Sequence, residues 1–260
     1  MLGAIVGDIV GSVYEFDNHR SKDFPLFQKD SKFTDDTILT IASADALMGD
    51  WDFAAKYREY ARMYPSSYGN SFHSWIHDDT AGPYNSFGNG SAMRVSPIAW
   101  FLHHDHRVML IAERSAEVTH NHPEGIKGAQ ATAMVVYWAR NGVPRNRIRR
   151  DLEERFGYDT STSVEELQET YEYNETCQRT VPEAFRCFYE ATDFEDAIRN
   201  AISIGGDSDT VAAIAGSMAE AKWGVPQEIG REALGRLDDK LRDTYEKFVS
   251  RYMPATQGMN

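Results

Sequence analysis

The stretch LGAIVGDIVGSV, residues 2–13, decides the fold class of this chain. Its small and apolar residues suit a buried helix, and Gly3, Gly7 and Gly11 recur every four residues. Glycines at that spacing share one helix face and permit close approach of another backbone, although each lowers helix propensity by about 1 kcal/mol relative to alanine. We therefore expect a helix here that packs tightly against another element.

Helical patterns continue outward from this segment. The run Thr34-Asp35-Asp36-Thr37 precedes apolar residues at helical spacing, which indicates an N-cap and a helix start. Further helices are expected at 52–63, 91–103, 107–119, 123–141, 145–156, 181–190, 194–204, 208–222 and 227–251. Alternating β-branched runs, which are typical of strands, are almost absent, and the polar stretch 157–180 shows no clear pattern. The sequence predicts an all-α chain with a single domain over 1–260 and a frayed tail at 254–260.

Charge and composition restrict the classes of partner. The net charge is −13, which disfavours binding to nucleic acid and to anionic membranes because there is no excess of basic residues. No apolar run reaches the ~20 residues that span a bilayer, and the first segment carries Asp8 but no basic residue, unlike a signal peptide. Cys177 and Cys187 are too far apart for a CxxC motif and are expected to be free thiols. We expect a cytoplasmic monomer without a membrane or stable nucleic-acid partner.

Two acidic motifs could carry chemistry. Thr34–Asp36 and Gly205-Gly206-Asp207-Ser208-Asp209-Thr210 each open a predicted helix, and each alone is explained as a helix cap or a glycine turn. Together they offer four carboxylates and several hydroxyls, with no His or Cys nearby. Oxygen ligands of this kind suit Mg²⁺ or Mn²⁺ rather than zinc. Because so many acidic groups would repel one another unless cations lay between them, two metal ions are expected if the motifs meet.

Other motifs are weaker on their own. Glu15 is flanked by aromatic residues, which could raise its pKa and suit a general acid or base, or it is a solvated residue at a helix end. The glycine-rich loop Ser86–Ser91 could present N–H groups to phosphate and Phe87 to a base, or it is only a turn. The histidines of Thr119–Glu124 could contact phosphate, although a structural role is the more common one.

In combination, these motifs resemble the ADP-ribosylglycohydrolases, the family that includes the dinitrogenase-reductase-activating glycohydrolase and the ADP-ribosylhydrolases. The resemblance extends from Gly3 to about Val225. It rests on five segments in the expected order: Gly7-Asp8 to Glu15-Phe16, Phe33 to Thr37, Gly88 to Arg94, Thr119 to Pro123, and Gly205 to Gly216. The first, second and last together are specific.

The resemblance implies a compact orthogonal helical bundle with two Mg²⁺ or Mn²⁺ ions in a central cleft. It implies metal ligands at Thr34, Asp35, Asp36, Asp207, Asp209 and Thr210, and catalytic roles for Glu15, Asp36 and Asp207. It implies substrate contacts from Tyr68, Gly69, Ser86, Phe87, Gly88, Asn89, His120 and His122, with either histidine near the distal ribose.

The activity that the resemblance implies is hydrolysis of the glycosidic bond between ADP-ribose and an acceptor, such as an arginine or serine side chain, which releases ADP-ribose. The alternatives are hydrolysis of a free derivative such as O-acetyl-ADP-ribose or ADP-ribose-1''-phosphate, and a non-catalytic ADP-ribose-binding protein. A helical phosphohydrolase is disfavoured because His77-Asp78 lacks the further ligands that such an enzyme needs. Residues 151–175 match no family segment, so the leaving group stays open.

Overall fold

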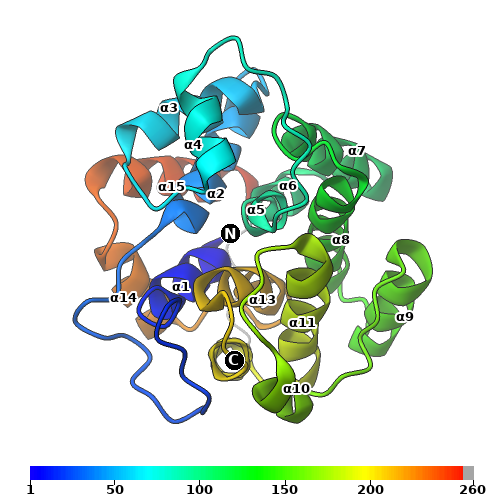
Figure 1. Cartoon of the computed structure of the whole chain (residues 1–260). Coiled ribbons are helices and arrows are strands. Elements are labelled where there is room, and N and C mark those ends of the chain that lie inside the picture. Colours follow the sequence, from blue (N-terminus) through cyan, green and yellow to red (C-terminus); the bar gives the residue numbers. More distant parts are fainter. Residues whose placement is uncertain (254–260) are drawn as a thin grey trace.

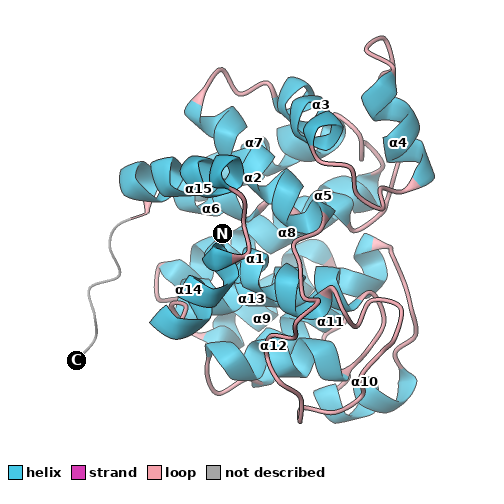
Figure 2. Ribbon diagram, turned by 90° about the vertical axis from the view of Figure 1, so that its left-hand side faces the viewer, coloured by secondary structure: helices cyan, strands magenta, loops and turns pink. Residues whose placement is uncertain are grey.

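The computed structural model describes residues 1–253, and within them every regular element is a helix (Figure 2). The predicted all-α fold is confirmed, while the predicted frayed tail lies outside the described residues. The helices are α1 Leu2–Gly11, α2 Asp35–Met48, α3 Phe53–Met63, α4 Asn70–His77, α5 Gly90–Met93, α6 Ser96–Phe101, α7 Asp105–Glu117, α8 Pro123–Arg140, α9 Arg145–Phe156, α10 Val164–Thr170, α11 Cys177–Glu190, α12 Phe194–Ser203, α13 Ser208–Trp223, α14 Gln227–Gly235 and α15 Asp239–Tyr252.

Helices α1 and α13 form the centre of the molecule, and the other helices surround them (Figure 1). The glycines of α1 face α13, as the spacing predicted. A Cβ atom on Gly7 would lie 2.0 Å from the carbonyl oxygen of Ala212, and one on Gly3 would lie 2.1 Å from that of Gly216. The two backbones therefore touch directly, and only glycine fits between them.

The helices around this central pair form one contiguous apolar core. Helices α2 to α4 and α15 lie on one side in Figure 1, and α5 to α9 lie on the other, with α11 and α12 packed against α13. Buried apolar side chains from Met1 to Phe248 belong to this single cluster. Both cysteines are buried free thiols, as expected. No helix of residues 1–253 is both long and apolar enough to cross a membrane.

Two predicted helices are each divided in the structure. The segment 91–103 forms α5 and α6, because Pro97, in the first turn of α6, has no N–H to continue a helical hydrogen-bond ladder back to Met93. The segment 227–251 forms α14 and α15, because the Asp238 side chain caps α15 by accepting a hydrogen bond of 2.8 Å from the Leu241 N–H.

The polar stretch 157–180 is also more regular than expected. It contains α10, which opens with a capping box: Ser163 accepts from the Glu166 N–H, and the Glu166 carboxylate accepts from the Ser163 N–H. Helix α11 begins at Cys177, four residues before the predicted start. Between these two helices lies the segment 171–176, which reaches the site described next.

Candidate metal centre and ligand cleft

The carboxylate of Asp8 holds the N-terminus of α2 against α1. It accepts hydrogen bonds from the Thr34 hydroxyl (2.6 Å), the Thr34 N–H (2.9 Å) and the Thr37 N–H (3.1 Å). Asp8 is fully buried, and desolvation raises its pKa although these donors oppose the shift. Asp8 thus fixes the first acidic motif at the junction of α1 and α13.

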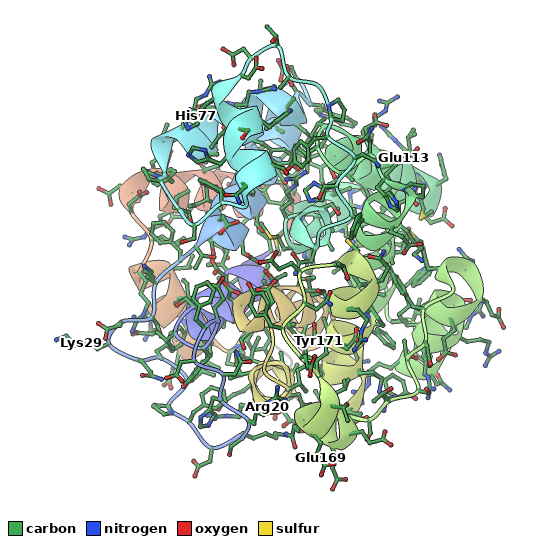
Figure 3. All side chains as sticks on the ribbon, viewed as in Figure 1. Arg20, Lys29, His77, Glu113, Glu169 and Tyr171 are labelled. Atoms are coloured by element: carbon green, nitrogen blue, oxygen red, sulfur yellow. The ribbon has the colours of Figure 1, made fainter. Side chains whose placement is uncertain are left out.

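Two glycines and two loop side chains fix the second acidic motif. Gly205 and Gly206 have φ angles of 71° and 77°, the left-handed region that glycine adopts without strain. Asn18 pairs with Gly206 through hydrogen bonds of 2.8 and 2.9 Å. Arg20 donates to the carbonyl oxygen of Ile204, just before the turn, at 2.9 Å and to that of Tyr171 at 2.6 Å; Figure 3 shows Arg20 and Tyr171 on the same side of the molecule. The turn before Asp207 is therefore tied to the loop that carries Glu15.

Five carboxylates from the two motifs, α1 and the loop after α1 converge. Asp8, Asp36 and Asp209 place one oxygen each within 4.8 Å of one another, and so do Glu15, Asp207 and Asp209. Asp209 belongs to both groups, which is the arrangement that two neighbouring cations need. The Asp36 Oδ1 atom is buried and has no hydrogen-bond partner in the described part of the chain. An all-oxygen donor set with an unsatisfied buried carboxylate oxygen fits hard divalent cations.

Burial and mutual repulsion disfavour the charged form of these groups. Desolvation, followed by the neighbouring carboxylates, raises the pKa of Asp36 and of Asp209 well above the usual range. The pKa of Glu15 rises to about 7, through desolvation first and the charge of Asp207 second. The pKa of Asp35 also rises to about 7, through desolvation and the charge of Asp8. The site therefore favours protons or cations between its carboxylates.

The remaining predicted ligands lie at the edge of the acidic groups. The Thr210 hydroxyl donates to Asp36 Oδ2 at 3.2 Å. The Thr34 hydroxyl oxygen lies 3.5 Å from Asp209 Oδ2, but the hydroxyl donates its closer hydrogen bond to Asp8 Oδ1. Asp35 is outside both clusters, and the Ser66 hydroxyl donates to it at 3.4 Å. The structure thus brings five of the six predicted ligands to the acidic groups, leaves Asp35 beside them, and adds the carboxylate of Asp8, to which the sequence assigned no role.

A cleft of about 320 Å³ opens over the acidic groups. Five of the eight residues predicted to contact substrate line it: Gly69, Ser86, Gly88, Asn89 and His120. Asn89 connects the glycine-rich loop to the acidic groups, because its side-chain amide donates to Asp207 Oδ2 at 2.6 Å and to the Thr180 hydroxyl at 3.2 Å. The glycine-rich loop is therefore linked directly to Asp207.

The structure places the other three predicted contact residues outside the cleft lining. The Tyr68 hydroxyl donates to the carbonyl oxygen of Tyr64 at 2.7 Å. His122 caps α8, where its Nδ1 accepts from the Glu124 N–H at 3.1 Å. The Phe87 ring is 45% exposed and lies against the His122 ring, 5.2 Å away between centroids. Of the two histidines, only His120 faces the cleft.

The segment 171–176 contributes residues that sequence reasoning missed. Tyr173 and Glu175 line the cleft, and the Tyr173 hydroxyl donates to Glu175 at 2.9 Å. Tyr173 stacks with Phe16, 6.4 Å away between ring centroids, and the charge of Glu175 helps to raise the pKa of Glu15. We call Phe16, Tyr173 and Glu175 the aromatic–acidic rim. Aromatic and acidic residues alternate in this segment, which was the available signal, but nothing in the sequence places it at the cleft.

Comparison with known proteins identifies the family that the sequence motifs resemble. The sequence model of the ADP-ribosylglycohydrolase family matches residues 1–259. The chain is 26% identical over 258 residues to the ADP-ribosylarginine hydrolase Tri1 of Pseudomonas putida, covering 86% of this chain and 70% of that protein. It is 24% identical over 310 residues to the ADP-ribosylhydrolase ARH3 of Homo sapiens, covering 87% and 85%. A solved structure described as an ADP-ribosylglycohydrolase-related protein complex shares the fold, with a TM-score of 0.72, 23% identity and 97% coverage of both chains.

Proposed function

Since the chain belongs to the ADP-ribosylglycohydrolase family, we propose that it hydrolyses the glycosidic bond between ADP-ribose and an acceptor, with two Mg²⁺ or Mn²⁺ ions as cofactors. The observation that carries this proposal is the pair of acidic groups that share Asp209 beneath a cleft lined by the glycine-rich loop. The proposed partners of the protein are ADP-ribose and an ADP-ribosylated substrate.

The proposed metal ligands are Thr34, Asp35, Asp36, Asp207, Asp209 and Thr210. The cations would offset the carboxylate charge and orient the ribose hydroxyls. Asp36 and Asp207 are held for this role by fixed partners: Thr210 donates to Asp36, and Asn89 donates to Asp207. Asp8 supports the ligands from behind, since the Thr34 and Thr37 donors already engage both of its oxygens.

Glu15 is the proposed proton carrier. It is half-buried, lies at the cleft side of the acidic groups and has a pKa of about 7. Hydrolysis at an anomeric carbon passes through an oxocarbenium-like state, and a carboxylic acid that protonates the leaving group lowers the barrier. The position of Glu15 in the cleft lining lets its carboxyl group deliver that proton to a leaving group bound there.

The aromatic–acidic rim supports a planar cationic acceptor, such as the guanidinium of arginine. Tyr173 and Phe16 offer ring faces for cation–π contact, and Glu175 offers a carboxylate next to Glu15. A serine acceptor is neutral and would leave both features without a role. The proposed substrate class is therefore ADP-ribosylarginine in a protein.

The experiment that tests this function compares release of ADP-ribose from ADP-ribosylarginine and ADP-ribosylserine peptides in Mg²⁺. We expect release from the arginine peptide, and Glu175→Gln should lower kcat/KM for that peptide by roughly tenfold because a charge-assisted contact is lost. Glu172→Gln is the matched control, since Glu172 is exposed and lies outside the cleft lining. Equal activity on both peptides, unaffected by Glu175→Gln, would contradict the proposed acceptor. Turnover of O-acetyl-ADP-ribose alone would favour the free-derivative alternative.

A further inference from the structure

The imidazole of His120 turns one nitrogen to the protein and one to the cleft. Its Nδ1 lies 2.8 Å from the Thr119 hydroxyl oxygen. Its ring lines the cleft, and in residues 1–253 no protein group forms a hydrogen bond with Nε2. A Cβ atom on Gly90 would lie 3.2 Å from Nε2, so the glycine leaves space on that side. The protein thus engages only Nδ1 and leaves Nε2 free for a ligand.

Arg94 fixes the direction of the hydrogen bond at Nδ1. The Arg94 side chain is fully buried and stacks over the Tyr57 ring, with its guanidinium carbon 3.9 Å from the ring centroid. One of its terminal nitrogens donates to the Thr119 hydroxyl at 2.8 Å and to the carbonyl oxygen of Ser115 at 3.2 Å. A guanidinium has no acceptor, so the Thr119 oxygen must accept from it.

The hydroxyl proton of Thr119 then has one close acceptor. That acceptor is His120 Nδ1, 2.8 Å away, whereas the Tyr84 hydroxyl makes only a weaker contact with Thr119, the smallest of the influences on the pKa of Tyr84. If Nδ1 carried the proton instead, the buried Thr119 hydroxyl would keep only the weaker contact with Tyr84, which disfavours that tautomer by roughly tenfold. With Nδ1 as acceptor, the proton of the neutral imidazole resides on Nε2.

We infer that Thr119 and Arg94 are positioning residues that hold His120 in the Nε2–H tautomer, so that it donates a hydrogen bond to an oxygen of the ligand in the cleft. Burial and the nearby charge of Arg94 lower the pKa of His120 well below its usual range, which keeps the ring neutral. The acceptor is a phosphate or a sugar oxygen, and that part of the inference rests on the proposed function. The tautomer itself does not depend on it.

Nuclear magnetic resonance of the ¹⁵N-labelled imidazole tests the tautomer in the ligand-free protein, with the His120 signals assigned by their absence in His120→Asn. We expect the correlation pattern of a protonated Nε2 and an unprotonated Nδ1. Thr119→Ser keeps the hydroxyl and should keep the pattern, whereas Thr119→Val should lose it. Tyr84→Phe should leave it unchanged, because the Thr119 proton does not go to Tyr84. A protonated Nδ1 in the wild-type protein would overturn the inference.

Calorimetric binding of ADP-ribose and of ADP, in Mg²⁺, tests what the tautomer is for. Thr119→Val should weaken ADP-ribose binding by about tenfold, with Thr119→Ser near the wild-type value. Thr132→Val is the matched control, since the Thr132 hydroxyl is buried in α8 and lacks a partner among the described residues. An equal loss for ADP assigns the acceptor to a phosphate, and a loss for ADP-ribose alone assigns it to the distal ribose. Unchanged binding of both ligands in Thr119→Val would overturn the role. Failure of the wild type to bind either ligand would instead refute the proposed function and leave the tautomer result standing.

Discussion

Replacing Gly7 with alanine tests the contact on which the whole site rests. The new Cβ would lie 2.0 Å from the carbonyl oxygen of Ala212, where an ordinary contact begins at 3.4 Å, a shortfall of 1.4 Å. The opposing atoms are backbone atoms, so no side chain can rotate away. The helices α1 and α13 must therefore separate by about that distance.

We expect Gly7→Ala to lower the free energy of unfolding, whereas helix propensity alone would raise it. In an isolated helix the substitution stabilises by about 1 kcal/mol, whereas overpacking a rigid interface costs about 3 kcal/mol at the upper end of its usual range. The net loss of about 2 kcal/mol corresponds to a fall in Tm of roughly 4–8 °C for a chain of this size. Asp8 follows Gly7 directly and holds Thr34, so a displacement of this size should also lower kcat by roughly a hundredfold.

Thermal unfolding and turnover are measured on Gly7→Ala beside Gly235→Ala. Gly235 is the last residue of α14, and a Cβ atom there meets nothing within 4 Å. The control should be as stable as the wild type or slightly more stable, with full activity. If Gly7→Ala behaved like this control, the reasoning about the contact between α1 and α13 would be refuted.

Three further predictions concern the acidic site. Asp209→Asn should abolish turnover while circular dichroism and Tm in EDTA stay at or above wild-type values, because a repelling carboxylate is removed from both acidic groups; unaltered turnover would contradict the metal assignment. In EDTA, the free energy of unfolding should fall as the pH rises from about 4 to 8. Folding raises the pKa of Glu15 and Asp35 from 4.5 and 3.8 to about 7, so the folded state holds protons that the unfolded chain releases. Saturating Mg²⁺ should remove this decline, and a decline that persisted would argue against cations at the site. Asn18→Ala should cost about 1–3 kcal/mol, because its two hydrogen bonds to Gly206 are lost, and should weaken Mg²⁺ binding in a calorimetric titration; unchanged affinity would mean that the turn holds Asp207 without Asn18.

Local chemistry in the sequence predicted much of the fold and part of the site. The glycine spacing of residues 2–13 predicted the close helix contact. The two acidic helix starts identified the candidate carboxylates, although these motifs alone did not show that they meet in space. These patterns involve residues close together in the sequence, so they can be recognised without knowledge of the tertiary structure. The breaks before Pro97 and Asp238 also had local signals, which longer apolar patterns concealed.

The remaining features depend on distant contacts. Asp8 is only a charge within an apolar segment until the start of α2 packs against it. The segment 171–176 reaches the cleft because Gly88 and Thr176 form an antiparallel bridge, which joins residues nearly ninety positions apart. His120 and His122 look equivalent in the sequence, and only the fold turns one to the cleft and the other to a helix cap.

In the proposed function, the paired acidic groups serve the metal-dependent hydrolysis of ADP-ribosyl bonds. Its most direct test is release of free ADP-ribose from ADP-ribosyl arginine, serine, nucleic-acid ends and O-acetyl-ADP-ribose, each in Mg²⁺ and in EDTA. We expect release from ADP-ribosylarginine that Mg²⁺ supports and EDTA abolishes. Release that EDTA does not affect, or binding of ADP-ribose without release from any of these substrates, would contradict the claim.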